Sequence, residues 1–124
     1  MNTLYGIPNC DTVKKARAWL TARGVDYTFH DFKKQGVPQD RLAVWCKAAG
    51  WDKLLNHQGT TWRKLDTDVQ AGVVDSASAQ ALMLANASVI KRPVVEWGGG
   101  DAAVSVGFDA AQWAELGAQF AGKQ

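Results

Sequence analysis

Residues 4–16 constrain the fold most, because a strand, a tight turn and a helix start follow one another there without a break. The apolar strand ends at Gly6, residues 7–9 (Ile-Pro-Asn) form the turn, and a helix begins at or directly after Cys10. The first N–H groups of a helix lack partners within the helix and carry a partial positive charge, so they stabilise a thiolate over a thiol. The thiolate is the nucleophilic form of cysteine. We therefore expect Cys10 to be the reactive centre of this chain.

Length and composition predict one domain, residues 1–124. With 124 residues, of which 47% are hydrophobic, the chain is long enough for one core and too short for two. Its formal net charge of +2 is small and its basic residues are dispersed, so nothing indicates nucleic acid or an anionic membrane as a partner. We expect neither.

The N-terminal residues and the cysteines indicate a cytoplasmic protein. Residues 1–5 lack the basic and apolar regions of a secretory signal, and no stretch reaches the length of a membrane span. Cys10 and Cys46 do not form a disulfide framework in a chain of this length, and a reducing compartment keeps both as thiols. His30 and His57 do not lie at zinc-ligand spacing with either cysteine, so no metal site is expected.

The first third of the chain predicts a strand, a helix and a second strand. Residues 3–6 and 27–32 have the aromatic and β-branched composition of strands, and residues 11–23 form a helix closed by Gly24. One face of this helix is apolar and consists of Val13, Ala16 and Leu20. Such a unit is right-handed with parallel strands, and ligands approach it at the carboxyl ends of the strands, where Cys10 lies.

The middle of the chain predicts a series of helices. Pro38 opens the first of them, which ends near Gly50. Its apolar stripe has helical spacing and consists of Leu42, Trp45, Cys46 and Ala49. Further helical segments are expected at residues 51–55, 62–65 and 77–87. The buried face of the last segment is either Leu82 with Ala85 or Met83 with Asn86.

The last third predicts a hairpin followed by a helix. Two β-branched runs, residues 94–97 and 102–106, flank the glycine-rich residues 98–101, which is typical of a β-hairpin. Asp109 and Gln112 resemble a capping box that opens the final helix. The apolar face of this helix consists of Trp113, Leu116, Gly117 and Phe120.

This order fits a thioredoxin-like α/β (α+β) fold, in which βαβ and ββα halves form a mixed four-stranded sheet and a helical insertion occupies about residues 36–87. Three segments resemble the ArsC/Spx family, and within it the YffB-like branch. They are residues 5–16 around Cys10, residues 56–65, which contain Gly-Thr-Thr-Trp-Arg-Lys-Leu, and residues 90–93, Ile-Lys-Arg-Pro. They occur in the family's order, and the resemblance covers nearly the whole chain.

The resemblance implies an active site formed by Cys10, Arg92 and Pro93. Pro93 is expected to follow a cis peptide bond and to face the nucleophile. An arginine at this place lowers the energy of the thiolate and can hold an oxyanion or a glutathione carboxylate. The ordinary alternative for Arg92 is a solvated charge at a strand end, but the adjoining proline favours the functional interpretation.

Further candidates for substrate binding are less specific. Asn9, Thr12 and Lys14 can donate to a bound substrate, and each can equally be a helix cap or a solvated side chain. Arg63 belongs either to an anion-binding loop or to an exposed basic turn whose Trp62 lies in the core.

The neighbours of Cys10 bear on its chemistry. Asp11 opposes ionisation of the thiol, and the lysines one turn further on offset it. Val13 stands where the second cysteine of a Cys-x-x-Cys motif would be, and Cys46 lies on an apolar stripe. These observations predict a monothiol mechanism in which glutathione or another external thiol resolves the adduct on Cys10.

The chain departs from the family at two places. Arsenate reductases of this group use further arginines to hold the oxyanion, whereas Asn56 and the pair Gly107 and Phe108 stand at the expected positions here. We therefore favour a thiol oxidoreductase with glutathione as co-substrate and no bound cofactor. The alternatives are an arsenate reductase that uses glutathione and glutaredoxin, and an Spx-like regulator that binds RNA polymerase. The missing Cys-x-x-Cys motif counts against the regulator.

Overall fold

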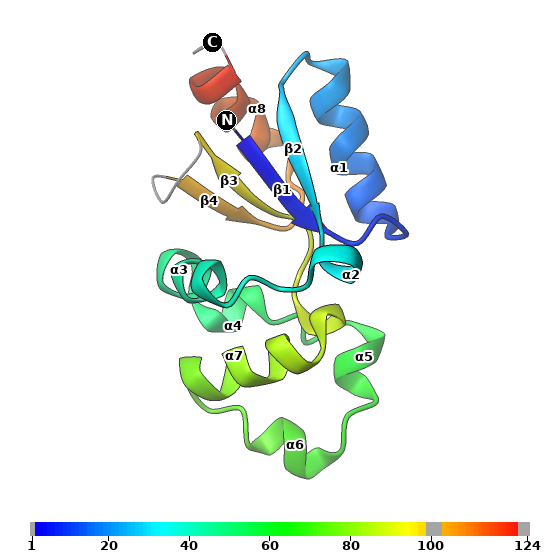
Figure 1. The fold of residues 1–124 in the computed structure, drawn as a ribbon, viewed down its shortest axis with the longest axis vertical. Helices are drawn as coiled ribbons and strands as arrows, with labels where there is room; N and C mark the ends of the chain where they lie inside the picture. Colours follow the sequence, from blue (N-terminus) through cyan, green and yellow to red (C-terminus); the bar gives the residue numbers. More distant parts are fainter. Residues whose placement is uncertain (1, 99–102, 122–124) are drawn as a thin grey trace. The chain divides into compact units, whose positions relative to one another are not determined.

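The computed structural model describes residues 2–98 and 103–121. In it the chain forms two compact units (Figure 1). The first unit consists of Met1–Gln35 and Arg92–Gln124, and the second of Gly36–Lys91. The predicted βαβ and ββα segments belong to the first unit. The predicted insertion, about residues 36–87, lies within the second.

The first unit is built on a mixed four-stranded sheet with the order β2-β1-β3-β4 (Figure 1). Strand β1 (Asn2–Gly6) pairs in parallel with β2 (Tyr27–Asp31) and antiparallel with β3 (Val94–Trp97). Strand β3 pairs antiparallel with β4 (Ala103–Val106). The α/β fold and the mixed sheet predicted from the order of elements are thereby confirmed.

Helix α1 (Asp11–Ala22) connects β1 to β2 and ends at a glycine. Gly24 has a φ of 68°, which favours glycine because it has no Cβ. Its N–H donates to the carbonyl of Thr21 at 3.1 Å, and the N–H of Val25 donates to that of Leu20 at 3.0 Å. These two bonds form a Schellman motif, which satisfies the last carbonyls of the helix.

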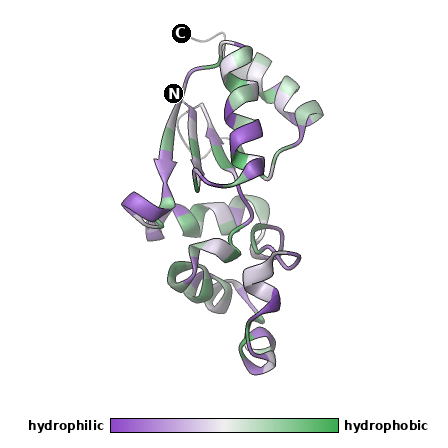
Figure 2. Ribbon diagram, turned by 90° about the vertical axis from the view of Figure 1, so that its right-hand side faces the viewer, coloured by the Kyte–Doolittle hydropathy of each residue, from purple (hydrophilic) through white to green (hydrophobic). Residues whose placement is uncertain are grey.

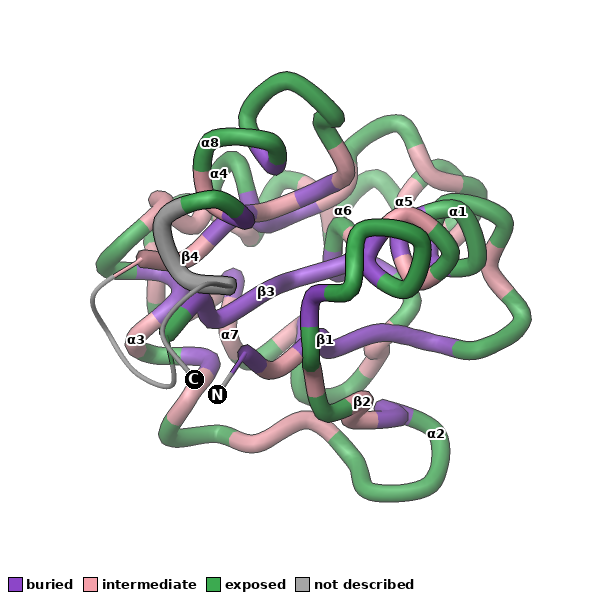
Figure 3. The backbone as a smooth tube through the Cα atoms, turned by 90° about the horizontal axis from the view of Figure 1, so that it is seen from above, coloured by how far each residue is buried: buried purple, intermediate pink, exposed green. Residues whose placement is uncertain are grey.

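Helix α8 (Ala110–Ala121) and α1 contribute apolar faces to one core with the sheet. The buried members of this core are Leu4, Val13, Ala16, Leu20, Val25, Val95, Trp97 and Trp113. Strand β3 is buried along its whole length (Figure 3). The predicted faces of α1 and of α8 are confirmed at these positions. The side chain of Phe120 and the predicted turn residues 99–101 lie outside the described part.

Helices make up most of the second unit. They are α3 (Gln39–Ala49), α4 (Trp51–Leu54), α5 (Thr60–Arg63), α6 (Thr67–Ala71), α7 (Ser76–Ala85) and the 3₁₀ helix η1 (Ala87–Val89). Figure 2 shows that the helices carry both hydrophobic and hydrophilic residues. Leu42, Trp45 and Cys46 are buried as predicted. In α7, Ala79 and Met83 are buried, so the face that contains Met83 is the correct one.

Short helices were the elements that the sequence pattern missed. Helix α2 (Phe32–Gln35) begins where the second strand was predicted to end. The carboxylate of Asp31 accepts the N–H of Lys33 at 2.8 Å, and the side chain of Gln35 accepts the N–H of Asp31 at 3.1 Å. These two polar contacts turn the chain at Phe32. Helix α6 was not predicted either, and α5 begins two residues before the predicted segment 62–65.

Helix caps also differ from the prediction. The complete capping box lies at the start of α7, where Asp75 accepts the N–H of Ser78 at 2.9 Å and the hydroxyl of Ser78 accepts the N–H of Asp75 at 3.1 Å. At the start of α8, Gln112 donates its N–H to Asp109 at 3.1 Å, which is one half of the predicted box.

Candidate functional site

The loop between β1 and α1 positions Cys10. Gly6 ends the strand, and a Cβ at this residue would lie 2.9 Å from Cγ2 of Val13, so glycine allows the strand end to approach the first turn of the helix. Pro8 and Asn9 are exposed on the turn. Cys10 is the N-cap residue of α1, with extended backbone angles, and its carbonyl accepts the N–H of Lys14 at 2.9 Å. The predicted place of Cys10, at the start of the helix, is correct.

Five effects act on the ionisation of Cys10, which is partly buried. Burial has the largest individual effect and raises the pKa of the thiol, because the charged form loses hydration. The N–H of Val13, the hydrogen bond and charge of Arg92, and the N–H of Thr12 all lower the pKa. Together they outweigh burial, so the pKa of Cys10 lies below the usual value for a thiol.

The backbone donors at the helix start are a part of this site that side-chain motifs do not reveal. The sequence predicted Val13 as a core residue that stands where a second cysteine of a Cys-x-x-Cys motif would be. Its N–H makes the largest single contribution among those that lower the pKa of Cys10. The prediction that a helix begins at Cys10 implies such donors. It does not indicate which amides point at the sulfur, since that depends on the rotamer of the cysteine.

Pairing within the sheet brings Arg92 to Cys10. Tyr5 lies opposite Val94 in the antiparallel pair of β1 and β3, so the start of β3 is next to the end of β1. The peptide bond between Arg92 and Pro93 is cis, as expected, and Pro93 is buried. Arg92 is half-buried and forms a hydrogen bond with the sulfur of Cys10. Two residues far apart in the sequence therefore form one site.

The remaining predicted residues near the helix start are accessible. Asn9, Thr12 and Lys14 have exposed side chains. The N–H of Thr12 interacts with the sulfur, whereas its hydroxyl has no role in lowering the pKa of Cys10. Contact between any of the three side chains and a substrate stays a prediction.

Arg63 belongs to the second unit, at the end of α5, and its side chain is exposed. The ring of the neighbouring Trp62 is half-buried and meets the edge of His57 at a centroid distance of 5.0 Å. Trp62 is thus not the fully buried core residue that one of the two interpretations required. A role of Arg63 in anion binding stays a prediction.

The loop before α5 is tied to the segment that leads into Arg92. Leu54 accepts the N–H of Lys91 at 2.7 Å, and Asn56 donates its N–H to Val89 at 2.7 Å, on either side of a bridge between Leu55 and Ile90. Asn56 is the first residue of the segment 56–65 that resembles the family. Its hydrogen bond to Val89 therefore joins this segment to the residue directly before the segment 90–93.

Cys46 differs from Cys10 in every respect that matters for reactivity. Its side chain is buried on α3, and burial raises its pKa, although a hydrogen bond with Ser76 lowers it in part. Both cysteines are free thiols. A buried thiol with a raised pKa is a poor nucleophile, which agrees with the structural role that the sequence indicated for Cys46.

Neither a metal site nor a membrane span is present in the described residues. No group of three or more histidine, cysteine, aspartate or glutamate side chains in residues 2–98 and 103–121 could hold a metal ion. Within the same residues, no helix is both long enough and apolar enough to cross a membrane.

The fold and the site together define a class: thioredoxin-like α/β proteins with a single activated cysteine at the start of the first helix, next to a cis-proline. The chain belongs to the ArsC family, whose model matches residues 5–116.

Three known proteins show how this family varies. The solved structure of a protein called YffB is 47% identical, with a TM-score of 0.86 over 94% of this chain and 98% of that one. An arsenate reductase (ArsC) related protein from Brucella melitensis is 52% identical, with a TM-score of 0.71 over 92% of each chain. The global transcriptional regulator Spx of Streptococcus pyogenes is 29% identical over 77% of this chain and 71% of its own. The chain is thus similar both to a protein named for its relation to arsenate reductase and to one named as a transcriptional regulator.

Proposed function

We propose that this protein is a glutathione-dependent monothiol oxidoreductase in which the thiolate of Cys10 is the nucleophile. The observation that carries the proposal is the lowered pKa of Cys10, which results from the start of α1 and from Arg92. Membership of the ArsC family supports a thiol-redox role. The raised pKa of Cys46 supports the use of one cysteine rather than two.

The proposed reaction has two thiol–disulfide exchanges. The Cys10 thiolate attacks the glutathione sulfur of a mixed disulfide, a new S–S bond forms on Cys10, and the substrate leaves as a thiolate that takes up a proton. A second glutathione thiolate then attacks the glutathione sulfur on Cys10 and releases oxidised glutathione. The substrate sulfur is reduced to a thiol, the sulfur of the second glutathione is oxidised, both glutathione sulfurs leave in one disulfide, and Cys10 returns to the thiolate. Arg92 stabilises the thiolate each time that it forms.

A direct test is the rate of alkylation of Cys10 by iodoacetamide as a function of pH. We expect the midpoint to lie below that of an ordinary thiol and to rise in Arg92→Ala, because the charge and one hydrogen bond are lost. Mass spectrometry after incubation with oxidised glutathione should show an adduct on Cys10 and none on Cys46. An ordinary thiol profile that is unchanged in Arg92→Ala would refute the proposed nucleophile.

Arsenate reduction by the same cysteine is the second candidate. The similarity to an arsenate reductase related protein supports it. Asn56 and Gly107 stand where arsenate reductases of this group are expected to have arginines, which counts against it. Turnover of arsenate with glutathione and glutaredoxin, absent in Cys10→Ser, would establish this activity.

Regulation through RNA polymerase is the third candidate, and it belongs to another class of function. It rests on the similarity to Spx proteins. Capture of RNA polymerase by the purified protein, in a cytoplasmic extract, would favour it over catalysis. If the protein does not bind polymerase but has glutathione-dependent reductase activity, the result would favour the oxidoreductase.

A further inference from the structure

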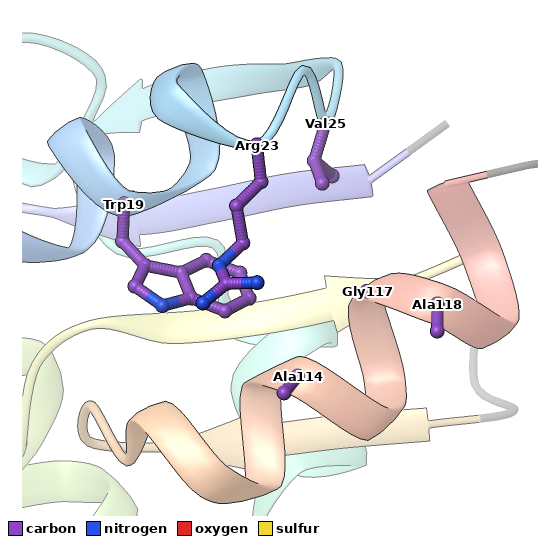
Figure 4. Close-up of a pocket in the computed structure, with 6 residues that line it drawn as sticks. All are labelled: Trp19, Arg23, Val25, Ala114, Gly117 and Ala118. Carbon is purple, nitrogen blue, oxygen red and sulfur yellow. The ribbon is translucent and has the colours of Figure 1, made fainter.

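The first unit contains a second concave site, at the end of α1 that is opposite Cys10. A pocket of about 220 Å³ lies between the end of α1 and helix α8 (Figure 4). Its lining residues are Trp19, Arg23, Val25, Ala114, Gly117 and Ala118. At about 1.5 Å of rise per helical residue, Arg23 lies roughly 20 Å along α1 from Cys10. The pocket is therefore separate from the thiol site.

Arg23 provides a cation at this pocket. Its guanidinium carbon lies over the indole of Trp19, 4.5 Å from the ring centroid, and Figure 4 shows the side chain extended along the ring. A guanidinium stacked in this way keeps the N–H groups at its edge for a planar acceptor. In the part of the chain that the structure describes, no carboxylate pairs with Arg23, although Asp26 and Glu115 are close in sequence to lining residues.

The opposite wall of the pocket is apolar and flat. Ala114, Gly117 and Ala118 follow one another at i, i+3 and i+4, which places them on one face of α8. A Cβ at Gly117 would lie 3.5 Å from Cη2 of Trp19, so the helix is near contact distance from the indole there. The small side chains leave the space next to the indole open. Beside this contact, Ala114 and Ala118 present an apolar surface that suits a flat hydrocarbon group.

The size of the pocket limits its ligand. A volume of about 220 Å³ is that of roughly seven water molecules in the liquid, which corresponds to a molecule of about seven to ten non-hydrogen atoms. A ligand of this size is smaller than a peptide. We propose that the pocket binds a free small-molecule carboxylate with a flat apolar body, such as an aromatic monocarboxylate. Its ring packs on the small residues of α8 beside the edge of Trp19, and its carboxylate pairs with Arg23.

Titration of the ¹⁵N-labelled protein with benzoate tests this proposal. We expect shifts of the Trp19 indole N–H and of the Gly117 and Ala118 amides, and none at the amides of Thr12 and Val13. Benzamide, which is the neutral isostere, and acetate, which lacks the ring, should bind at least tenfold more weakly. Equal binding of benzoate and benzamide would overturn the pairing with Arg23.

Variants of three arginines locate the binding. Arg23→Gln should weaken benzoate binding at least tenfold. Arg17→Gln is the matched control, because Arg17, on α1, also lies over an aromatic ring, 4.1 Å from the centroid of Phe29 on β2, but does not line the pocket. Arg17→Gln and Arg92→Ala should bind benzoate as the wild type does. Loss of binding in Arg92→Ala, with binding kept in Arg23→Gln, would place benzoate at the thiol site and overturn the proposal.

Two further measurements test the shape of the pocket and the kind of ligand. Ala118→Leu fills the pocket with a residue that favours helix, and it should abolish binding of benzoate while Arg23 remains. Unchanged affinity in Ala118→Leu would refute the pocket as the site. A tripeptide that ends in a phenylalanine carboxylate should bind more weakly than phenylacetate. Tighter binding of the tripeptide would overturn the assignment to a free small molecule.

Discussion

Gly6, four residues before Cys10, contacts a residue that lowers the pKa of the Cys10 thiol. Gly6 lets β1 end within contact distance of Val13, and the N–H of Val13 is one of the groups that hold the Cys10 thiolate. The same residue, Val13, therefore fills the core and lowers the pKa of Cys10. A side chain at Gly6 would press on Val13 and so disturb both the packing of the core and the N–H group near Cys10.

The substitution Gly6→Ala tests this dependence. The new Cβ would lie 2.9 Å from Cγ2 of a buried valine, so the first turn of α1 must shift. We expect a loss of about 1–3 kcal/mol in the free energy of unfolding, which is typical of overpacking, and a higher alkylation midpoint for Cys10. Urea unfolding and alkylation measure the two effects.

Removal of the opposing methyl groups is the control for Gly6→Ala. In the double variant Gly6→Ala/Val13→Ala, the clash is relieved, so the variant should be more stable than the sum of the two single effects implies. Strict additivity would show that the two residues do not compete for the same space.

Tyr5 and Glu96 form a buried polar pair in the sheet. The hydroxyl of Tyr5 donates to Oε1 of Glu96 at 2.8 Å, and Glu96 is only 5% exposed. In Tyr5→Phe, the carboxylate loses this donor, and we expect a loss of about 1–3 kcal/mol in the free energy of unfolding. Thermal or urea unfolding measures it.

Tyr27→Phe is the matched control for Tyr5→Phe. Tyr27 is half-buried, and its hydroxyl accepts a bond of 3.0 Å from Nε of Arg17. Because water can replace this bond, the loss should be below about 0.5 kcal/mol. Equal losses in the free energy of unfolding for Tyr5→Phe and Tyr27→Phe would show that the burial of Glu96 does not increase the cost of losing its hydrogen-bond donor.

Helix α1 serves two sites because both of its ends are defined by local chemistry. Its start presents N–H groups to Cys10, and its last turn carries Trp19 and leads to Arg23 at the pocket. The Schellman motif at Gly24 ends the helix and directs Val25 into the core. The positions of Arg23 and Val25 thus depend on the backbone conformation of one glycine.

Gly24→Ala tests this helix end. Because φ is 68° at this residue, alanine adopts a strained conformation, and we expect a loss of about 1 kcal/mol in the free energy of unfolding. Gly72→Ala is the control, since Gly72 also follows a helix, α6, but has a φ of −77° that any residue adopts. That substitution should be neutral or stabilise by up to about 1 kcal/mol. A stabilised Gly24→Ala variant would contradict the left-handed conformation.

The stability of the whole molecule should depend on pH through both cysteines, with opposite signs. The pKa of Cys10 is lowered in the folded state, so the folded chain binds fewer protons than the unfolded chain between the two pKa values. This contribution is complete above the unfolded pKa and disappears as pH falls through the folded pKa. The difference in unfolding free energy between the wild type and Cys10→Ser should therefore grow with rising pH in this window.

Cys46→Ala provides the comparison for this measurement. Burial raises the pKa of Cys46, so its contribution is complete below the unfolded pKa of a thiol and decreases as pH rises towards the folded pKa. The difference in the free energy of unfolding between the wild type and Cys46→Ala should therefore decrease with rising pH. Slopes of the same sign for Cys10→Ser and Cys46→Ala would contradict the assignment of the two thiols.

The sequence predicted the parts of the fold that neighbouring residues determine. The face of α1 with Val13 and Leu20, the place of Cys10 at the helix start and the two strands of the hairpin all follow from local spacing. Helix α2 was missed because it depends on two polar contacts, at Asp31 and Gln35, that have no periodic pattern. Periodicity identifies long amphipathic elements, and short capped turns escape it.

By itself, the sequence determined that a cysteine begins a helix after a strand, because the hydrogen bonds involved join residues within one turn of each other. Only the tertiary structure decided that Arg92 contacts that cysteine, since this contact requires β3 to pair with β1. It also decided that Trp19 and Arg23 face α8 across a pocket. Contacts between residues distant in the chain depend on how the apolar faces pack together, and a pattern of neighbouring residues does not encode that packing.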